Sequence, residues 1–110
     1  KTVLGDPTDK DVLIFAGAEK AKAIIIAVPD RYSQELIIEN SLGLKPGVLL
    51  ICRSHFEEDH RRLYALGVSI VISPELEAGI SMGHRVLDSL GFDRLKTASF
   101  LKQVRREQSV

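Results

Sequence analysis

The chain has 110 residues, of which 15 are basic and 15 acidic, so its formal net charge at pH 7 is zero. This length allows one domain with a substantial core, and the balanced charge excludes a whole-chain field that would attract nucleic acid or an anionic membrane. One cysteine excludes an internal disulfide, and no apolar run approaches the roughly 20 residues that cross a bilayer. The start at Lys1, without a signal-peptide pattern, predicts a piece of a longer protein.

The first quarter of the chain predicts two strands with a short helix between them. Lys1–Leu4 is a short strand candidate, and the turn after it predicts a helix capped by Thr8. Residues 23–28 hold three isoleucines among small apolar residues with no polar alternation, which is typical of a strand buried on both faces. Asp30 then takes the N-cap position of a helix that we expect to end at Gly43.

Two further strand–helix units follow. Residues 48–52 and 68–72 are apolar and predict strands. Ser54 and Glu57 form a capping-box pattern at the start of the helix between them. Ser73-Pro74 places an N-cap and an N1 proline before a helix that runs to about residue 90. Strands that alternate with helices at this spacing predict an α/β fold with a parallel sheet, and the polar caps gather on one rim of that sheet.

Six short segments resemble the second half of the RCK, or KTN (TrkA-N), domain, a cytosolic regulator of potassium channels and transporters. Their order and spacing over about residues 3–87 carry the resemblance, and Val28-Pro29-Asp30 is most similar to the Kef-type monovalent cation:proton antiporters. The segments are Gly5-Asp6-Pro7-Thr8, Ala18-Glu19-Lys20-Ala21, residues 25–30, Ile51-Cys52-Arg53-Ser54, Leu66-Gly67-Val68 and Val71-Ile72-Ser73-Pro74-Glu75.

The resemblance implies a Rossmann-like parallel sheet of order 3-2-1-4-5-6, with helices on both faces, that binds NAD(H), AMP, ATP or related nucleotides. The first β-α-β unit with its glycine-rich turn is absent from this chain, so we expect a truncated fold. Lys1–Leu4 then has no native neighbour, and we expect it to fray, to pair with another chain or to move beside residues 23–28. The implied division is a partial RCK/KTN domain over residues 1–91 and a helical tail over residues 92–110. We therefore expect no cofactor in this fragment, and NAD(H) or AMP/ATP as ligands of the parent domain.

Four residues are candidates for nucleotide binding. The resemblance places Asp6 and Thr8 near the adenine end of the nucleotide and Asp30 near its other end; a turn and a helix cap explain the same residues without a ligand. Arg53 follows a buried strand, where its guanidinium group would pair with a phosphate or a glutathione carboxylate, or with a surface carboxylate of the protein itself. Cys52 before it fits either a small buried hydrophobe or a redox sensor.

The helix after Pro74 predicts a homodimer. Gly79 and Gly83 lie four apart on one face, and each costs about 1 kcal/mol relative to alanine in a helix interior. Close approach of another backbone would explain both, either from the sheet beneath or from the same helix of a partner. The family dimerises through its later helices, which favours the partner. The predicted dimer interface comprises Gly79, Gly83, Leu76, Ile80 and Leu87.

No catalytic or metal-binding constellation is predicted, because the three histidines are scattered and carboxylates are absent from the positions where calcium-gated relatives place them. We therefore expect a non-enzymatic, dimerising, ligand-sensing regulatory domain of a potassium:proton antiporter or related potassium transport protein. Its partner would be the membrane transport domain of the same protein, on the cytoplasmic side of the inner or plasma membrane, with no insertion of its own. The alternatives are the distal fragment of an NAD-dependent dehydrogenase, which would need an acid/base near the nicotinamide, and a dimerisation module without a ligand.

Overall fold

The computed structural model describes residues 2–108. The chain folds as two compact units, one ending at Ile72 and one beginning at Ser73. Within residues 2–108, no helix has the length and apolar character needed to cross a membrane. The domain boundary expected at residue 91 remains a prediction, because the two units reflect packing within this chain alone.

The first unit is a parallel sheet with order β1-β2-β3. Pairing is parallel throughout, with Ile26 opposite Cys52 and Cys52 opposite Val71, which confirms the predicted α/β class. The elements are α1 (Lys10–Ala16), a 3₁₀ turn η1 (Ala18–Lys20), β1 (Ala23–Ile26), α2 (Arg31–Leu44), β2 (Leu49–Arg53), α3 (Asp59–Ala65) and β3 (Ile70–Ile72).

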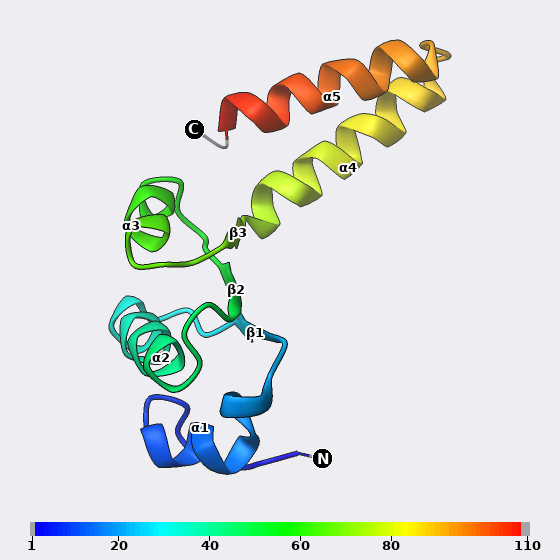
Figure 1. The fold of residues 1–110 in the computed structure, drawn as a ribbon. Coiled ribbons are helices and arrows are strands. Elements are labelled where there is room, and N and C mark those ends of the chain that lie inside the picture. The colour runs from blue at the N-terminus through cyan, green and yellow to red at the C-terminus, as the bar shows by residue number, and fades with distance from the viewer. Residues whose placement is uncertain (1, 109–110) are drawn as a thin grey trace. The chain divides into compact units, whose positions relative to one another are not determined.

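One face of this sheet holds the core of the first unit. Figure 1 shows α2 and α3 on the same side of the three strands. This follows from the strand order, because successive right-handed crossovers that advance in one direction place their helices on the same face. Apolar side chains from the strands, the two helices and the turns between them are buried there: Ile26, Ile37, Ile38, Val48, Leu50, Cys52, Leu63 and Val68.

The opposite face is not covered within the first unit, so the expectation of a central strand buried on both faces is wrong for this chain. Ile25 is 72% exposed, whereas its neighbour Ile26 is 3% exposed. Leu49, Ile70 and Ile72, on the other strands, are also exposed. Helices are expected on both faces of the sheet, and within residues 2–72 they lie on one. The continuous isoleucine run produces an apolar second face that α1, α2 and α3 do not reach.

The N-terminal strand candidate forms no strand in the described residues, in agreement with the expectation that this segment would fray for lack of a neighbour. Lys1 lies outside the described residues, and Thr2–Leu4 have no regular secondary structure. A strand needs a neighbour for its backbone groups, and the sheet of the described residues runs only from β1 to β3.

The cap of α1 also differs from the prediction. Asp9, not Thr8, is the N-cap, and its carboxylate accepts a hydrogen bond from the Asp11 backbone N–H at 2.9 Å. The Thr8 hydroxyl is already engaged, because it donates to Asp6 Oδ1 at 2.8 Å.

Two other helix boundaries differ from the predicted ones, and the causes are local. Ser54 forms no capping box with Glu57, because its backbone N–H donates to the Ile72 carbonyl and its hydroxyl bonds to the Phe56 backbone; α3 begins later, at Asp59. Helix α2 continues through Gly43 to Leu44. It ends just before Pro46, which disfavours helical conformation in the residue ahead of it.

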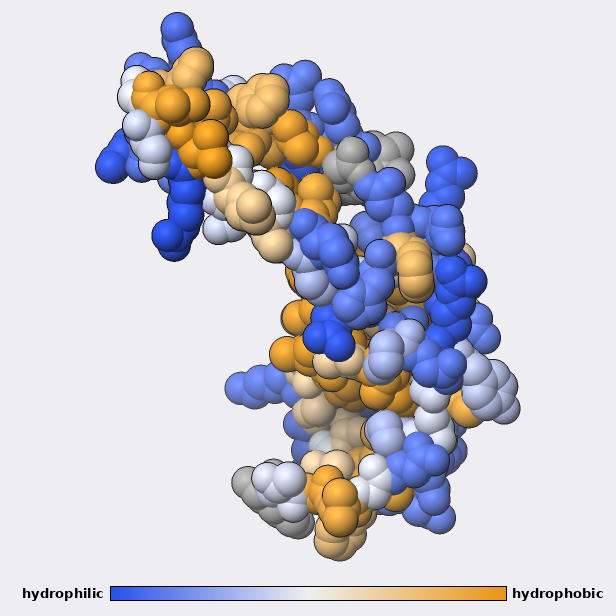
Figure 2. Space-filling view, turned by 180° about the vertical axis from the view of Figure 1, so that it is seen from behind, coloured by the Kyte–Doolittle hydropathy of each residue, from blue (hydrophilic) through white to orange (hydrophobic). Residues whose placement is uncertain are grey.

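The second unit is a hairpin of α4 (Pro74–Ser89) and α5 (Arg94–Gln108). Ser73 caps α4 as predicted, with its hydroxyl accepting from the Leu76 N–H at 3.4 Å, and Pro74 opens the helix. Gly91 has φ of +82° in the turn, a conformation that favours glycine. Leu101 is buried against α4, while apolar side chains gather at the surface around the turn (Figure 2).

Candidate functional site

The carboxyl ends of β1 and β2 are joined by one buried amide. Gln34, which is 3% exposed, donates from Nε2 to the carbonyl oxygens of Val28 at 2.8 Å and Arg53 at 3.2 Å. Val28 lies two residues beyond the end of β1 and Arg53 is the last residue of β2, so the amide bonds backbone carbonyls at the ends of both strands. The segments that carry Asp30 and Arg53 are therefore held together at one edge of the sheet.

Asp30 caps α2 with its carboxylate. Its Oδ2 accepts from both the hydroxyl and the backbone N–H of Ser33, each at 2.8 Å. These bonds, the hydroxyl bond first, lower the pKa of the Asp30 carboxyl, because they favour the charged form. The residue thus presents a negative charge at the start of α2 across the neutral pH range.

Arg53 ends β2 with an exposed guanidinium group at the same edge. Its NH2 donates to the Ala27 carbonyl at 2.8 Å. This bond turns the side chain across the end of β1 and fixes a positive group there. An arginine fork held at the carboxyl edge of a parallel sheet is suited to a phosphate or carboxylate.

Asp6 and Thr8 lie in a separate group. Asp6 Oδ1 accepts from the Thr8 backbone N–H at 2.9 Å and from its hydroxyl at 2.8 Å, and these bonds, the backbone one first, lower the pKa of Asp6. Asn40 Nδ2 donates to the Thr8 carbonyl at 3.0 Å. Asn40 follows Asp30 by ten residues along α2, or about 15 Å of helix. The structure therefore does not bring the four candidates into one cluster.

Sequence reasoning missed an ionic network beside this edge. Asp59, which is 5% exposed, lies 3.1 Å from Arg31 Nε and 3.6 Å from Arg62 Nε. Arg62 also pairs with Glu35 at 2.7 Å, and the Arg31 guanidinium carbon lies 5.5 Å from the centre of the Phe56 ring. The i,i+3 spacing of Asp59 and Arg62 was the available sequence signal for one pair of this network.

The predicted interface residues of α4 partly face α5 of the same chain. A Cβ on Gly83 would lie 3.6 Å from Leu101 Cδ2, which is ordinary contact, whereas a Cβ on Gly79 would meet nothing within 4 Å. Leu76, Gly79, Ile80 and Gly83 line a groove with side chains of α5. Leu87 lines a different hollow, nearer the turn.

Cys52 lies in the core and not in a reactive position. It is fully buried, and burial raises the pKa of its thiol; the nearby Arg62 charge opposes that shift and Asp59 adds to it. A protonated, enclosed thiol is a poor nucleophile. In residues 2–108, no three His, Cys, Asp or Glu side chains are grouped so as to hold a metal ion.

The family model of the TrkA-N domain matches residues 1–74, about two-thirds of the sequence. The chain belongs to the TrkA-N domain family. The matched part covers all four nucleotide-site candidates and ends at the start of α4. This membership confirms the resemblance found in the sequence.

Curated relatives with this TrkA-N segment are much longer proteins. The glutathione-regulated potassium-efflux system protein of Haemophilus influenzae is 27% identical over 105 residues, which cover 96% of this chain and 17% of the relative. The glutathione-regulated potassium-efflux system protein KefC of Klebsiella pneumoniae is 31% identical over 91 residues, 83% of this chain and 15% of the relative. The chain spans about a sixth of the length of these relatives.

Solved structures show the same fold. The Kef CTD of Shewanella denitrificans in its AMP-bound form has a TM-score of 0.86 at 21% identity, covering 99% of this chain and 69% of that one. The TrkA-N domain of the inner membrane protein ybaL from Escherichia coli has a TM-score of 0.66 at 25% identity, covering 73% of this chain and 59% of that one. The Rossmann-like fold class is therefore confirmed.

Proposed function

We propose that this chain is part of the cytosolic regulatory domain of a potassium:proton antiporter or a related potassium transport protein. The observation that carries the proposal is sequence similarity over 96% of the chain to a glutathione-regulated potassium-efflux system protein. The fold of the Kef CTD, shared over 99% of the chain, supports it. The partner in this proposal is the membrane transport part of the same protein, and the domain works on the cytoplasmic side without catalysis.

Ligand binding is assigned to the carboxyl edge of the sheet. Arg53 supplies a guanidinium group for a phosphate or a glutathione carboxylate, and Asp30 lies on the segment that Gln34 joins to it. Asp6 and Thr8 would contact the adenine end of a nucleotide such as AMP, ATP or NAD(H). Because this chain has no glycine-rich phosphate turn, such a ligand would also need contacts from a further part of the domain. The uncovered apolar face of the sheet suits packing against that further part.

A homodimer would transmit the ligand signal. We assign its interface to the α4 groove that contains Gly79, because a side chain there would meet nothing within 4 Å in the chain itself. A ligand then shifts the dimer between two arrangements by the difference in its affinity for them. The matched test is Gly79→Leu against Ala78→Leu, an exposed neighbour on the same helix. Light scattering should show a wild-type dimer that only Gly79→Leu weakens, and a wild-type monomer would overturn the dimer.

The regulatory role is tested in the complete gene product that contains this chain. Potassium flux is measured in membrane vesicles with and without AMP, NADH and a glutathione conjugate, for wild type, Arg53→Met and Arg61→Met. Arg61 is an exposed arginine on α3 and serves as the matched control. We expect basal transport in all three proteins and loss of the ligand response in Arg53→Met alone. Absence of potassium flux, or flux that none of the ligands alters, would contradict the proposal.

A further inference from the structure

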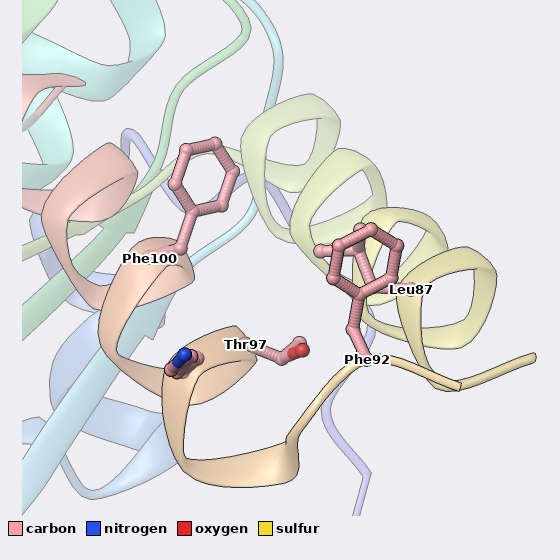
Figure 3. A pocket seen from close by; sticks show the side chains of 5 residues that line it. Leu87, Phe92, Thr97 and Phe100 are labelled. Carbon is pink, nitrogen blue, oxygen red and sulfur yellow. The ribbon is translucent and has the colours of Figure 1, made fainter. Parts of the chain in front are cut away.

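A hollow lies between the two helices of the hairpin, close to its turn. Its lining comprises Leu87, Phe92, Lys96, Thr97 and Phe100, and its volume is about 310 Å³ (Figure 3). This volume lies at the lower end of the range for small-molecule sites, about 300–1,000 Å³. The hollow belongs to the second unit alone and uses none of the residues assigned to the nucleotide edge.

The walls of the hollow are apolar and open to solvent. Phe92 is 58% exposed and Phe100 is 57% exposed, while Leu87 is half-buried between the helices. Aromatic rings have large apolar surfaces whose burial is strongly favourable. A ligand with an apolar body would cover both rings at once.

Thr97 adds a polar group to this apolar lining. The residue is 4% exposed, its hydroxyl Oγ1 is buried, and among the described residues this hydroxyl has no hydrogen-bond partner. Figure 3 shows the side chain directed toward Leu87 and Phe92, away from the axis of its own helix. A buried hydroxyl without a partner destabilises the folded state. An acceptor atom on a ligand would satisfy it.

Lys96 supplies a positive charge at the same hollow. Its side chain is exposed and lines the hollow beside Thr97. The carboxylate nearest in sequence, Asp93, accepts hydrogen bonds from the backbone N–H groups of Leu95 at 2.8 Å and Lys96 at 3.2 Å. That carboxylate is therefore used to cap α5, and an incoming anion has an ammonium group to pair with.

We propose that this hollow binds a small monocarboxylate with an alkyl or aryl body. The apolar body packs against Leu87, Phe92 and Phe100. The carboxylate accepts a hydrogen bond from the Thr97 hydroxyl and pairs with the Lys96 ammonium group. This site shares no residue with the nucleotide edge, so the proposal for one site can be disproved without affecting the proposal for the other.

The test titrates the 110-residue chain with straight-chain carboxylates from butanoate to decanoate and with the alcohols of equal length. Binding is followed by amide shifts in NMR spectra. We expect shifts centred on residues 87–100, affinity that rises about threefold per added methylene until the hollow is filled, and tighter binding of each carboxylate than of its alcohol. Lys96→Met should weaken the carboxylates about three- to fivefold and leave the alcohols unchanged. Lys102→Met, an exposed lysine of α5 outside this hollow, should change neither.

The Thr97→Val variant distinguishes an effect on carboxylate binding from an effect on the stability of the hairpin. Valine has the shape of threonine without the unpaired hydroxyl, so the hairpin should be as stable as wild type or more stable, while carboxylate affinity falls about fivefold. The proposal is overturned if no saturable shifts occur in residues 87–100, or if carboxylates and alcohols bind alike and Lys96→Met has no effect. It is also overturned if light scattering shows a dimer that Phe92→Ser dissociates while wild type binds no carboxylate, because a second copy then fills the hollow.

Discussion

The carboxylate of Asp59 lies 3.1 Å from the Nε of Arg31, although the Asp59 side chain is only 8% exposed and its partner comes from another helix. Arg62 approaches the same carboxylate, with its Nε at 3.6 Å from Oδ1. One buried negative charge therefore joins the first turn of α2 to α3. Both helices follow strands at the edge where Arg53 lies, so this contact contributes to the geometry of the proposed ligand edge.

Asp59→Asn should lower the free energy of unfolding by about 1–3 kcal/mol. The reason is that two guanidinium groups lose a charged acceptor, and one of them, Arg62, has buried nitrogen atoms. Urea unfolding followed by circular dichroism measures the change. Glu58→Gln is the control, because Glu58 is 77% exposed and lies 3.5 Å from Arg31; it should cost less than about 1 kcal/mol. Equal effects of the two substitutions would show that burial of Asp59 has no energetic consequence.

Adjacent isoleucines of β1 should respond very differently to substitution. Ile26→Ala removes a side chain that is 3% exposed and should cost about 2–5 kcal/mol. Ile25→Thr changes a side chain that is 72% exposed and keeps a branched Cβ, so it should change stability by less than about 0.5 kcal/mol. Denaturant midpoints of the two variants provide the comparison. A large loss in Ile25→Thr would mean that the second face of the sheet is covered when the 110-residue chain is in solution.

Alanine substitutions at Gly67 and Gly17 would distinguish the energetic cost of backbone strain from the cost of a steric clash. Both glycines have positive φ, +108° and +96°, but a Cβ on Gly67 would lie 2.7 Å from Leu42 Cδ1, whereas one on Gly17 would meet nothing within 4 Å. Each alanine should cost about 1–2 kcal/mol for the left-handed conformation. Gly67→Ala should cost more, and the additional Leu42→Ala substitution should remove that excess in a double-mutant cycle. Thermal unfolding of the four proteins of the cycle and of Gly17→Ala checks this, and equal losses at both glycines would exclude the contact with Leu42.

The cap of α2 should weaken in acid. Because the pKa of Asp30 is lowered on folding, its contribution is present above the unfolded value, about 3.9, and is lost as pH falls through the folded value. Asp30→Asn keeps a good cap without that titration, so the wild-type advantage should shrink below about pH 3.9. Unfolding measured from pH 2 to 7 tests this, with Glu39→Gln, an exposed carboxylate on the same helix, as the control for loss of one charge. A difference between wild type and Asp30→Asn that is independent of pH would contradict the cap assignment.

The positions of the three strands and the helix start at Pro74 could be predicted from the sequence because both depend on local signals. Apolar runs mark strands, and Ser73 with Pro74 marks a helix start. The sequence did not reveal that only one face of β1 is buried. Three isoleucines are equally apolar, and Ile25 differs from Ile26 only because the crossover helices pack on one side of the sheet.

The sequence could indicate which candidate residues share an edge of the sheet, but not the long-range contacts beside that edge. Asp30 and Arg53 follow strands that pair, so their shared edge follows from topology. The Asp59–Arg31 pair joins residues 28 positions apart, and no local pattern reveals such a pair. Ser54 illustrates the opposite case, in which a correct local motif is overridden because its backbone remains bonded to β3.

Because Cys52 is buried in the sheet, the reactivity of its thiol can measure local unfolding of the first unit. The sequence has one cysteine, and its thiol is fully buried in β2 within the first unit. A thiol-reactive dye would therefore label the folded chain only through fluctuations that expose the core beneath α2 and α3. The labelling rate would follow the sheet and not the hairpin, so ligands of the two parts can be distinguished by whether they slow this reaction.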